Sequence, residues 1–487
     1  MIRLLFLLHR YLGIAVGALM AMWCLSGLVM MYVSYPALDG RTRLAHLTPI
    51  NWGHCCRISG SILGDTDPVP PFRVEMLGGR PVLNLQLRPE SAALIDLSTG
   101  ARIDQVSATQ AASVAAAYTP VPSRAGAARI PGASGITRRA PRLIDQLDFD
   151  QWTLEGISPA QRPLYHFDLH DSRGGELYVS SSTGRAVQLT TRWQRFWNWL
   201  GAVPHWLYFA DLRHHVWLWS QVVIYTSLIG CFLAATGLYI GVRQLICSPR
   251  ERWSPYRGFN LWHHISGLLF GLFALTWVLS GLLSMNPWGL MEGGGAGAER
   301  AQLRGAPISG MELRAALQNL AAAAPADAVS IESASLAGKL FVIASRADGR
   351  RRRLDAYGAA TRLSSADRRF IAASLHGEAE GMQLLRQGDA YYFSFPGDPV
   401  ELPVWRVLTR DGTGRRYYVD PVSGTLIAAV DRGSEHYRWW HDALHRMDFA
   451  ALVRGRPQWD VLMWLLMSGA TVICVTGTYL GYRRLAQ

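Results

Sequence analysis

Four long, nearly uncharged segments of apolar residues constrain this chain more than any other feature. They lie at about 11–35, 216–242, 258–286 and 460–482. Each is long enough to cross a hydrocarbon layer roughly 30 Å thick as a helix. With 49% apolar and 17% charged residues, the 487-residue chain is too polar to be a membrane bundle alone. The sequence therefore predicts four transmembrane helices that carry two large polar segments.

Basic residues lie at the ends of these segments. Arg3 and Arg10 precede the first, Arg483 and Arg484 close the chain, and the loop between the second and third holds Arg243, Arg250, Arg252 and Arg257. Positively charged flanks stay in the cytoplasm. We therefore expect a multi-pass protein of the bacterial inner membrane, with both termini cytoplasmic and the long segments periplasmic. This placement also explains the net charge of +12 without a nucleic-acid partner.

The chain then divides into seven parts. These are transmembrane helix 1 (1–35), a first outer domain (36–192), an interfacial helix with transmembrane helix 2 (193–245), a cytoplasmic loop (246–257), transmembrane helix 3 (258–286), a second outer domain (287–434), and an interfacial helix with transmembrane helix 4 (435–487).

Alternating and turn-forming residues indicate that both outer domains are α+β. Tyr418 to Gly424 reads as a strand followed by a tight turn, and Tyr178 to Gly184 is similar. Further strands are expected at 81–87, 93–97 and 339–345, and a helix at 310–323. The Gly-, Ala- and Arg-rich tracts at 123–140 and 291–305 are expected to be loops.

The two halves of the chain match each other without gaps. A shift of 254 residues aligns His9 with His263, and it also aligns Gly17/Gly271, Trp23/Trp277, Ser26/Ser280 and Gly27/Gly281. A shift of 240 aligns His205 with His445, and it also aligns Gly184/Gly424, Thr236/Thr476, Gly237/Gly477 and Tyr239/Tyr479. Duplicated membrane proteins often place their working site between the halves, so shared polar residues are the first candidates for chemistry.

Two histidine pairs recur in this way. His9 and His263 lie near the cytoplasmic ends of the first and third helices, while His205 and His445 precede the second and fourth in aromatic stretches. Ionisable groups in a bilayer are costly and usually functional. The alternatives are interfacial histidines anchored at the headgroups and an aromatic belt with incidental histidines. His264, His441, His215 and His214 have no histidine counterpart, so they are weaker candidates; neighbouring His263 and His264 compete for one role.

Two symmetry-related imidazoles in an apolar slot suit a planar cofactor with two axial ligands. Zinc prefers a compact set of three or four ligands, whereas haem b accepts two histidines. We therefore expect two haem b groups per chain, one near each membrane face. Gly13, Gly17, Gly267 and Gly271 allow close approach of a macrocycle, although helix packing alone also explains them. No Cys-x-x-Cys-His sequence is present for covalent haem attachment.

Two further clusters resemble metal sites. His166, Asp168 and His170 alternate along a strand, but their counterparts are Arg406, Leu408 and Arg410, so a hydrogen-bonded surface is the favoured reading. His54-Cys55-Cys56 offers metal or redox ligands, but no second cluster completes a tetrahedral set. Adjacent cysteines rarely bridge each other, so we expect no disulfide between Cys55 and Cys56.

Several motifs resemble the PepSY-associated transmembrane family, also known as iron-regulated membrane proteins, which includes inner-membrane ferric-siderophore reductases. They are Leu8 to Gly13, Trp-x-x-Ser-Gly at Trp23 and Trp277, Tyr418 to Gly424, Leu444-His445, and Thr-Gly-x-Tyr-x-Gly in the second and fourth helices. The resemblance implies PepSY-like outer domains and two haems held by His9, His263, His205 and His445.

These features predict an oxidoreductase that uses haem b to reduce a periplasmic ferric siderophore or another ferric chelate. No nucleotide-binding fingerprint is evident, so a quinol or a cytoplasmic reductase would supply electrons. The sequence does not indicate catalytic residues beyond the haem ligands. Two alternatives remain open: a non-enzymatic, membrane-anchored PepSY regulator of a peptidase, and a transporter of iron or a siderophore.

Overall fold

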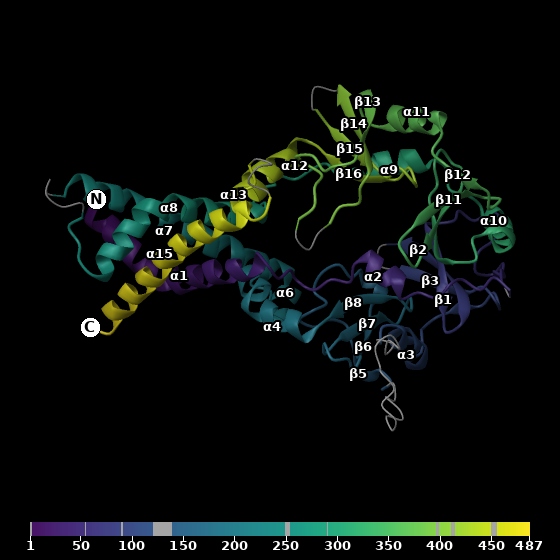
Figure 1. Ribbon diagram of the computed structural model, residues 1–487, viewed down its shortest axis with the longest axis horizontal. Coiled ribbons are helices and arrows are strands. Elements are labelled where there is room, and N and C mark those ends of the chain that lie inside the picture. Colours follow the sequence, from purple (N-terminus) through teal and green to yellow (C-terminus); the bar gives the residue numbers. More distant parts are fainter. Residues whose placement is uncertain are drawn as a thin grey trace, which may run out of the picture.

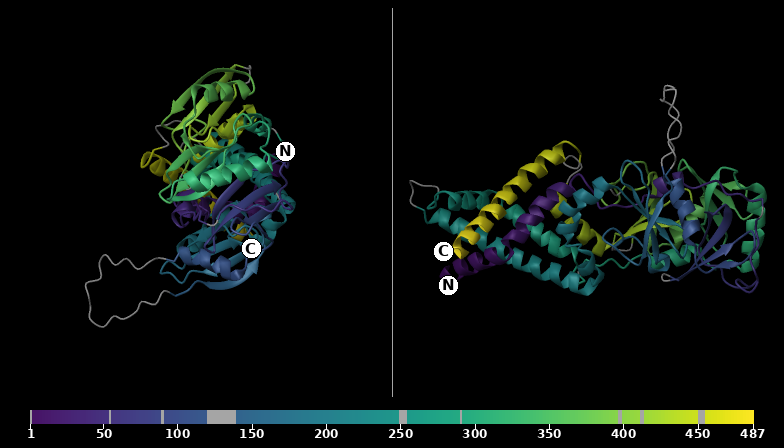
Figure 2. Two further views of the ribbon diagram at one scale, coloured as in Figure 1. Left: turned by 90° about the vertical axis from the view of Figure 1, so that its right-hand side faces the viewer. Right: turned by 90° about the horizontal axis from the view of Figure 1, so that it is seen from below.

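The molecule is elongated, with a helical bundle at one end and β-sheets at the other (Figure 1; Figure 2, right). Both chain termini lie at the end of the bundle farthest from the sheets. The computed structural model describes residues 2–53, 55–88, 91–119, 139–248, 254–289, 291–395, 399–410, 414–449 and 455–487. Arg250 and Arg252 of the basic loop, and most of the tract at 123–140, lie outside these ranges.

Four helices in the described residues are long and apolar enough to cross a membrane. They are α1 (Ile2–Met30), α7 (Val216–Ile246), α8 (Phe259–Ser284) and α15 (Gln458–Leu485). Helix α1 begins at Ile2, before the start that apolar residues alone suggested, so Arg3 and Arg10 lie inside the helix rather than before it. Helices tolerate long basic side chains near their ends, since these reach the polar interface.

The bundle exposes large apolar side chains that a soluble helix would bury. Leu269 is 64% exposed and Val461 is 68% exposed. Extended apolar surfaces of this kind require a hydrocarbon environment or a partner. Together with the length of the helices, they identify this part of the molecule as membrane-associated.

An eight-stranded antiparallel sheet, the central sheet, joins segments from both halves of the chain. Its strand order is β12-β11-β10-β9-β1-β2-β3-β4. Pairing of Arg73 with Glu332 and of Val74 with Ile331 links the halves. The strands are β1 (Phe72–Leu77), β2 (Arg80–Arg88), β3 (Ser91–Asp96), β4 (Arg102–Ile103), β9 (Ala328–Ser333), β10 (Phe341–Arg346), β11 (Arg351–Asp355) and β12 (Ala360–Thr361). The segments 36–192 and 287–434 therefore share one sheet.

Two four-stranded sheets complete this end of the molecule. One contains β5 (Arg142–Leu147), β6 (Leu164–Asp168), β7 (Glu176–Ser180) and β8 (Ala186–Thr190); the other contains β13 (Glu378–Leu385), β14 (Val404–Arg410), β15 (Arg416–Val419) and β16 (Leu426–Val430). The helices at this end are α2 (Gly40–Ala45), α3 (Ala108–Ala117), η1 (Pro159–Gln161), α9 (Gly297–Arg304), α10 (Gly310–Ala323) and α11 (Ser365–Ser374). We refer to these sheets and helices together as the sheet domain.

Short helices connect the sheet domain to the bundle. They are α4 (Arg192–Leu200), α5 (Ala202–Trp206) and α6 (Ala210–His214) before α7, and α12 (Arg432–Tyr437), the π-helical turn η2 (Arg438–Ala443) and α13 (Leu444–Arg446) before α15. Leu207 and Met447 follow α5 and α13 with left-handed φ angles of 53° each. The chain thus turns sharply after His205 and after His445.

Several local predictions are confirmed, including both hairpins, the strands β2, β3 and β10, and helix α10. One is wrong: the tract at 291–305, expected to be a loop, contains helix α9. Apart from Gly297, the glycines of this tract lie before or after α9. Leu303 anchors α9 in a hydrophobic core, so tertiary packing outweighs the loop-like composition.

Candidate functional site

The structure contains two histidine pairs, and the two rings of each pair face each other between helices of the bundle. His9 of α1 and His263 of α8 have ring centroids 6.3 Å apart. His205 of α5 and His445 of α13 have ring centroids 5.9 Å apart. We name them the far-side pair and the sheet-side pair. The structure therefore brings together the same residues that the two sequence shifts aligned.

The two pairs lie near opposite ends of the bundle. His9 is in the second turn of α1, while the His205 ring approaches Gly27 near the other end of that helix. A helix rises about 1.5 Å per residue, so the stretch from His9 to Gly27 spans roughly 27 Å. The two sites are thus separated by most of the thickness of a bilayer core.

Each ring uses Nδ1 for a hydrogen bond within the protein. His9 Nδ1 lies 3.2 Å from the Leu233 carbonyl oxygen, and His263 Nδ1 lies 3.1 Å from that of Ile473. A carbonyl only accepts, so Nδ1 carries the proton in both rings. The described residues provide no hydrogen-bond partner for Nε2 of either ring. Nε2 is therefore the nitrogen available to a further ligand.

The sheet-side pair is held by serines of the transmembrane helices. His205 Nδ1 lies 3.1 Å from both the Ser26 hydroxyl and the Trp23 carbonyl. His445 Nδ1 lies 2.9 Å from the Ser280 hydroxyl, which itself donates to a backbone carbonyl. A hydroxyl that donates elsewhere accepts from the ring, so Nδ1 is again protonated. The sequence reasoning gave Ser26 and Ser280 no role, although their alignment in the two halves was the available signal.

Glycines make room for these rings. A Cβ atom at Gly237 would lie 2.7 Å from His9 Cε1, and one at Gly477 would lie 3.0 Å from His263 Cε1. A Cβ atom at Gly27 would lie 3.4 Å from His205 Cε1 and 2.8 Å from a methionine side chain. Any larger residue at Gly237 would therefore displace a histidine ring. These glycines also align in the two halves.

Two buried indole groups of the bundle lack partners. Trp23 Nε1 and Trp277 Nε1 have no hydrogen-bond partner among the described residues. Buried donors are normally paired, and each unpaired one is costly. These tryptophans lie one turn before Ser26 and Ser280 in matched positions of the two halves.

Burial keeps the sheet-side rings neutral. It lowers the pKa of His205 to about 4, and with nearby positive charge it lowers the pKa of His445 well below its usual value. Neutral imidazole is the form that binds metals. Both rings are therefore in the metal-binding state at physiological pH.

His264 is engaged on both sides by the protein. Its Nδ1 lies 2.7 Å from the Ser254 hydroxyl, and its Nε2 lies 2.9 Å from the Gly241 carbonyl oxygen. Neither nitrogen is available to a further ligand. Of the two adjacent histidines, His263 is the one that faces His9.

The remaining weaker candidates differ in position. The His441 ring lies 5.3 Å from that of His445, and its Nδ1 lies 2.9 Å from the Ser280 carbonyl oxygen. His441 therefore borders the sheet-side pair. His214 is exposed and stacks on Phe149 at 4.0 Å, and His215 is exposed beside it. These two rings lie away from both pairs.

The cluster around His166 forms a hydrogen-bonded network, as the sequence indicated. His166 Nδ1 lies 3.1 Å from Asp145 and its Nε2 lies 3.2 Å from Glu176. His170 lies 3.2 Å from Asp168. Burial alone would lower the pKa of His166, but the hydrogen bond and charge of Glu176, with the charges of Asp150 and Asp145, raise it. The network therefore favours a protonated His166.

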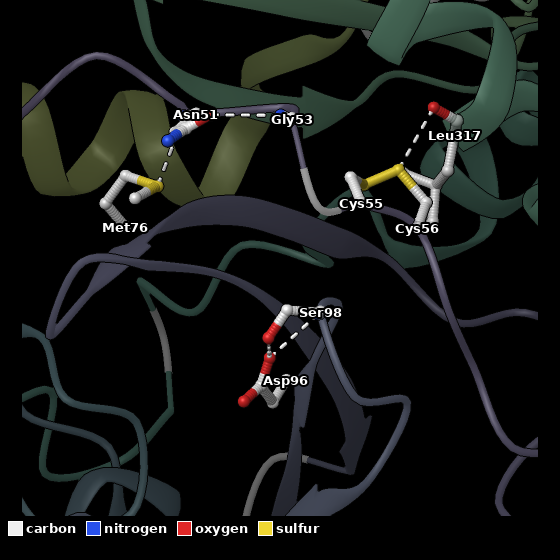
Figure 3. Close-up of a disulfide and its surroundings, with 8 residues drawn as sticks. All are labelled: Asn51, Gly53, Cys55, Cys56, Met76, Asp96, Ser98 and Leu317. Carbon is white, nitrogen blue, oxygen red and sulfur yellow. Dashed lines mark hydrogen bonds between the residues drawn. A yellow bond between two sulfur atoms is a disulfide. The ribbon is translucent and has the colours of Figure 1, made fainter.

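Cys55 and Cys56 form a disulfide with each other, so the expectation that these neighbours remain unbridged is wrong (Figure 3). The peptide bond between them is cis. The Cys56 sulfur lies 3.3 Å from the Leu317 carbonyl oxygen. A disulfide has no thiolate for a metal. His54, the third member of this cluster, lies outside the described residues.

The chain matches no protein family model, and no curated protein matches it. Within the described residues, no group of three or more His, Cys, Asp or Glu side chains gathers as a metal site. The two facing histidine pairs are therefore the basis on which a function can be proposed.

Proposed function

We propose that this chain is a membrane oxidoreductase that holds two haem b groups and passes electrons across the bilayer to a periplasmic ferric siderophore. The observation that carries this proposal is the presence of two facing imidazole pairs near opposite ends of the bundle.

The spacing of each pair fits one metal ion between two rings. A metal–imidazole bond is about 2.0 Å long, so two rings on opposite sides of one ion have centroids roughly 6 Å apart. The measured separations of 6.3 and 5.9 Å agree with this value. Two ligands and apolar walls fit haem, whose macrocycle supplies the other donors, better than zinc.

When bound, haem b supplies iron that takes up and releases a single electron. The protein's own residues determine the ligand geometry. Carbonyl groups of α7 and α15 and the hydroxyls of Ser26 and Ser280 hold Nδ1–H, which orients each ring and leaves Nε2 free. The apolar helices around the rings would place these sites beside the hydrocarbon of the membrane. Burial and these hydrogen bonds are the means by which the chain would tune a redox potential.

The orientation follows from the basic residues and the position of the termini. Both termini lie at the far-side end of the bundle, where Arg3, Arg483 and Arg484 also occur. Positively charged flanks favour the cytoplasm. We therefore assign the far-side pair to the cytoplasmic face of a bacterial inner membrane and the sheet domain to the periplasm. A membrane quinol or a cytoplasmic reductase would donate the electrons.

The assignment of a ferric siderophore as acceptor is supported by motifs that resemble those of PepSY-associated ferric-siderophore reductases. The chemistry requires one electron for each Fe(III) reduced to Fe(II), and the weaker chelate then releases its iron. The sheet-side pair lies next to the sheet domain, so an acceptor docked there would be close to the second site.

Proteoliposomes provide the test. We would supply a quinol in the membrane and a ferric hydroxamate siderophore outside, with an external Fe(II)-trapping dye. We expect Fe(II) to form with the wild-type protein and to be lost in His205→Ala and His445→Ala. The matched control His214→Ala should retain the activity, because His214 is exposed and lies away from both pairs.

Failure to form Fe(II) in the wild-type protein, with haem bound, would remove the reductase assignment. Siderophore uptake without any reductant would instead indicate a transporter. A protein that remains colourless when expressed with ample haem, yet alters a peptidase, would indicate the regulatory alternative.

A further inference from the structure

A cavity of about 270 Å³ opens in the sheet domain, apart from both histidine pairs. Helix α2, strand β1, helix α3 and the turn between β7 and β8 surround it, and these elements lie together away from the bundle (Figure 1). The polar residues that line it include Arg43, His46, Arg73, Glu75, Tyr118 and Arg185. The proposed electron path uses none of them.

Three arginines share one buried carboxylate in this cavity. Arg43 Nη1 lies 2.9 Å from both oxygens of Glu75, Arg73 Nε lies 3.6 Å from Glu75, and Arg185 Nε lies 3.8 Å from it. Arg73 has a second partner in Glu332 at 2.8 Å. Even with Glu332 included, the arginines outnumber the carboxylates by three to two. The cavity wall therefore carries excess positive charge.

Burial and the neighbouring arginines both disfavour the charged form of Arg185. Burial, together with the charges of Arg73 and Arg43, lowers the pKa of Arg185 to about 10. A guanidinium in such surroundings is stabilised by any anion that enters. Arg185 Nε is also buried without a hydrogen-bond partner among the described residues, since the Glu75 oxygen is beyond hydrogen-bond distance.

A second orphaned donor lines the same cavity. The Tyr118 side chain is only 6% exposed, and its hydroxyl has no hydrogen-bond partner among the described residues. Its ring stacks on His46 at 4.2 Å, which restrains its orientation. Burial raises the pKa of Tyr118, so the hydroxyl stays protonated as a donor. Buried donors without partners are rare, and two in one cavity indicate a missing acceptor.

The other half of the chain neutralises the corresponding region. Under the 240-residue shift, Arg185 aligns with Thr425 and Ser180 aligns with Asp420. Asp420 accepts from Arg351 at 3.0 Å, and Glu401 lies 2.9 Å from the same guanidinium. The second half thus lacks the arginine and adds a carboxylate. At these two aligned positions, the first half therefore carries more positive charge than the second.

We propose that this cavity binds a small oxyanion, a carboxylate or a phosphate group, with Arg185 and Tyr118 as its donors. A bound oxyanion supplies the acceptor oxygens that both donors lack and neutralises the excess charge. The volume suits a small ligand or the anionic end of a larger one.

Isothermal titration calorimetry on the full-length, detergent-purified chain tests the proposal. Inorganic phosphate and citrate are titrated separately, so the two arms distinguish a phosphate from a carboxylate ligand. We expect saturable binding of at least one probe. Affinity should fall about tenfold or more in Arg185→Thr, which installs the residue of the second half, and by a smaller factor in Tyr118→Phe.

Arg102→Thr is the matched control, because Arg102 is an exposed arginine of the same sheet that does not line the cavity. Its binding should equal that of the wild type. Thermal unfolding would verify that each variant is folded. The proposal is overturned if neither probe gives saturable heat, or if folded Arg185→Thr and Tyr118→Phe both bind like the wild type. Equal loss of binding in the control would show nonspecific charge attraction and would also overturn it.

Discussion

At the scale of single residues, the four candidate ligands share one local design. Each histidine donates Nδ1–H to an acceptor on a bundle helix, and the rings of His9, His263 and His205 each pass close to a glycine. Such partners of a ligand usually matter almost as much as the ligand itself. The serines and glycines therefore offer sharper tests than removal of the histidines.

Ser280→Ala should weaken haem binding at the sheet-side pair by about 10- to 100-fold. The substitution removes the hydroxyl that accepts from His445 and leaves the backbone intact. Transfer of haem to excess apomyoglobin would measure the loss. Ser284→Ala, one turn further along α8, removes a hydroxyl that binds only the Gly281 carbonyl and should have no effect. If both variants retain haem equally well, Ser280 does not support haem binding through His445.

Gly237→Ala should displace the His9 ring and reduce bound haem from two groups per chain toward one. The added methyl would lie 2.7 Å from His9 Cε1, closer than real contacts allow. Gly267→Ala places a methyl in open space and is the control. Haem per chain, from pyridine haemochrome spectra, is the measurement. A normal count in Gly237→Ala would show that the far-side site does not depend on this ring position.

At the scale of elements, buried and exposed charges on neighbouring strands should differ in importance. Glu75 of β1 is nearly buried among three arginines, whereas the Glu332 side chain of β9 is 40% exposed. Removing one partner of a buried charge cluster leaves uncompensated charge. Removing one partner of an exposed pair costs little.

Glu75→Gln should therefore destabilise the sheet domain by about 3–5 kcal/mol. Glu332→Gln should cost about 1 kcal/mol or less. Chemical denaturation followed by fluorescence would compare the two variants with the wild type. Similar losses for both would mean that solvent screens the Glu75 cluster more than its burial implies.

The hydrogen-bonded His166 network, which links β5, β6 and β7, should make the stability of the sheet domain depend on pH. The raised pKa of His166 means that the folded state binds its proton more tightly. This stabilisation is full below the unfolded pKa of about 6.5 and is lost as pH rises through the folded pKa. The melting temperature of the wild-type protein should therefore decrease as the pH rises through the folded-state pKa of His166. His166→Gln should flatten the dependence, and the exposed His376→Gln should not; an unchanged slope in His166→Gln would contradict this.

Local elements can be predicted where the apolar pattern agrees with the capping or turn residues at the ends of the element. Helix α10 has a capping serine and an apolar face, and the β15–β16 hairpin has a Pro-x-Ser-Gly turn, so both follow from sequence. The sequence does not reveal helix α9, because glycines flank it and one of its two buried residues, Glu299, is charged. The sequence does not reveal the disulfide of Cys55 and Cys56, because adjacent cysteines rarely bridge each other.

At the scale of the whole molecule, long-range pairing is what the sequence does not reveal. The β1–β9 contact joins strands more than 250 residues apart into one sheet. The pattern of apolar residues in a strand does not indicate which other strand it pairs with. The histidine pairs were predictable because the two halves align, yet the choice of His263 over His264 required the hydrogen bonds of both rings. The placement of one pair near each end of the bundle is the basis of the proposed electron path.

The most direct test of that proposal is the haem count of the detergent-purified chain, with visible spectra before and after dithionite. We predict two haem b groups per chain, with one lost in His9→Ala or His263→Ala and the other lost in His205→Ala or His445→Ala. The His264→Ala variant should retain two if it folds. A colourless wild-type protein, expressed with ample haem, would contradict the assignment of both pairs.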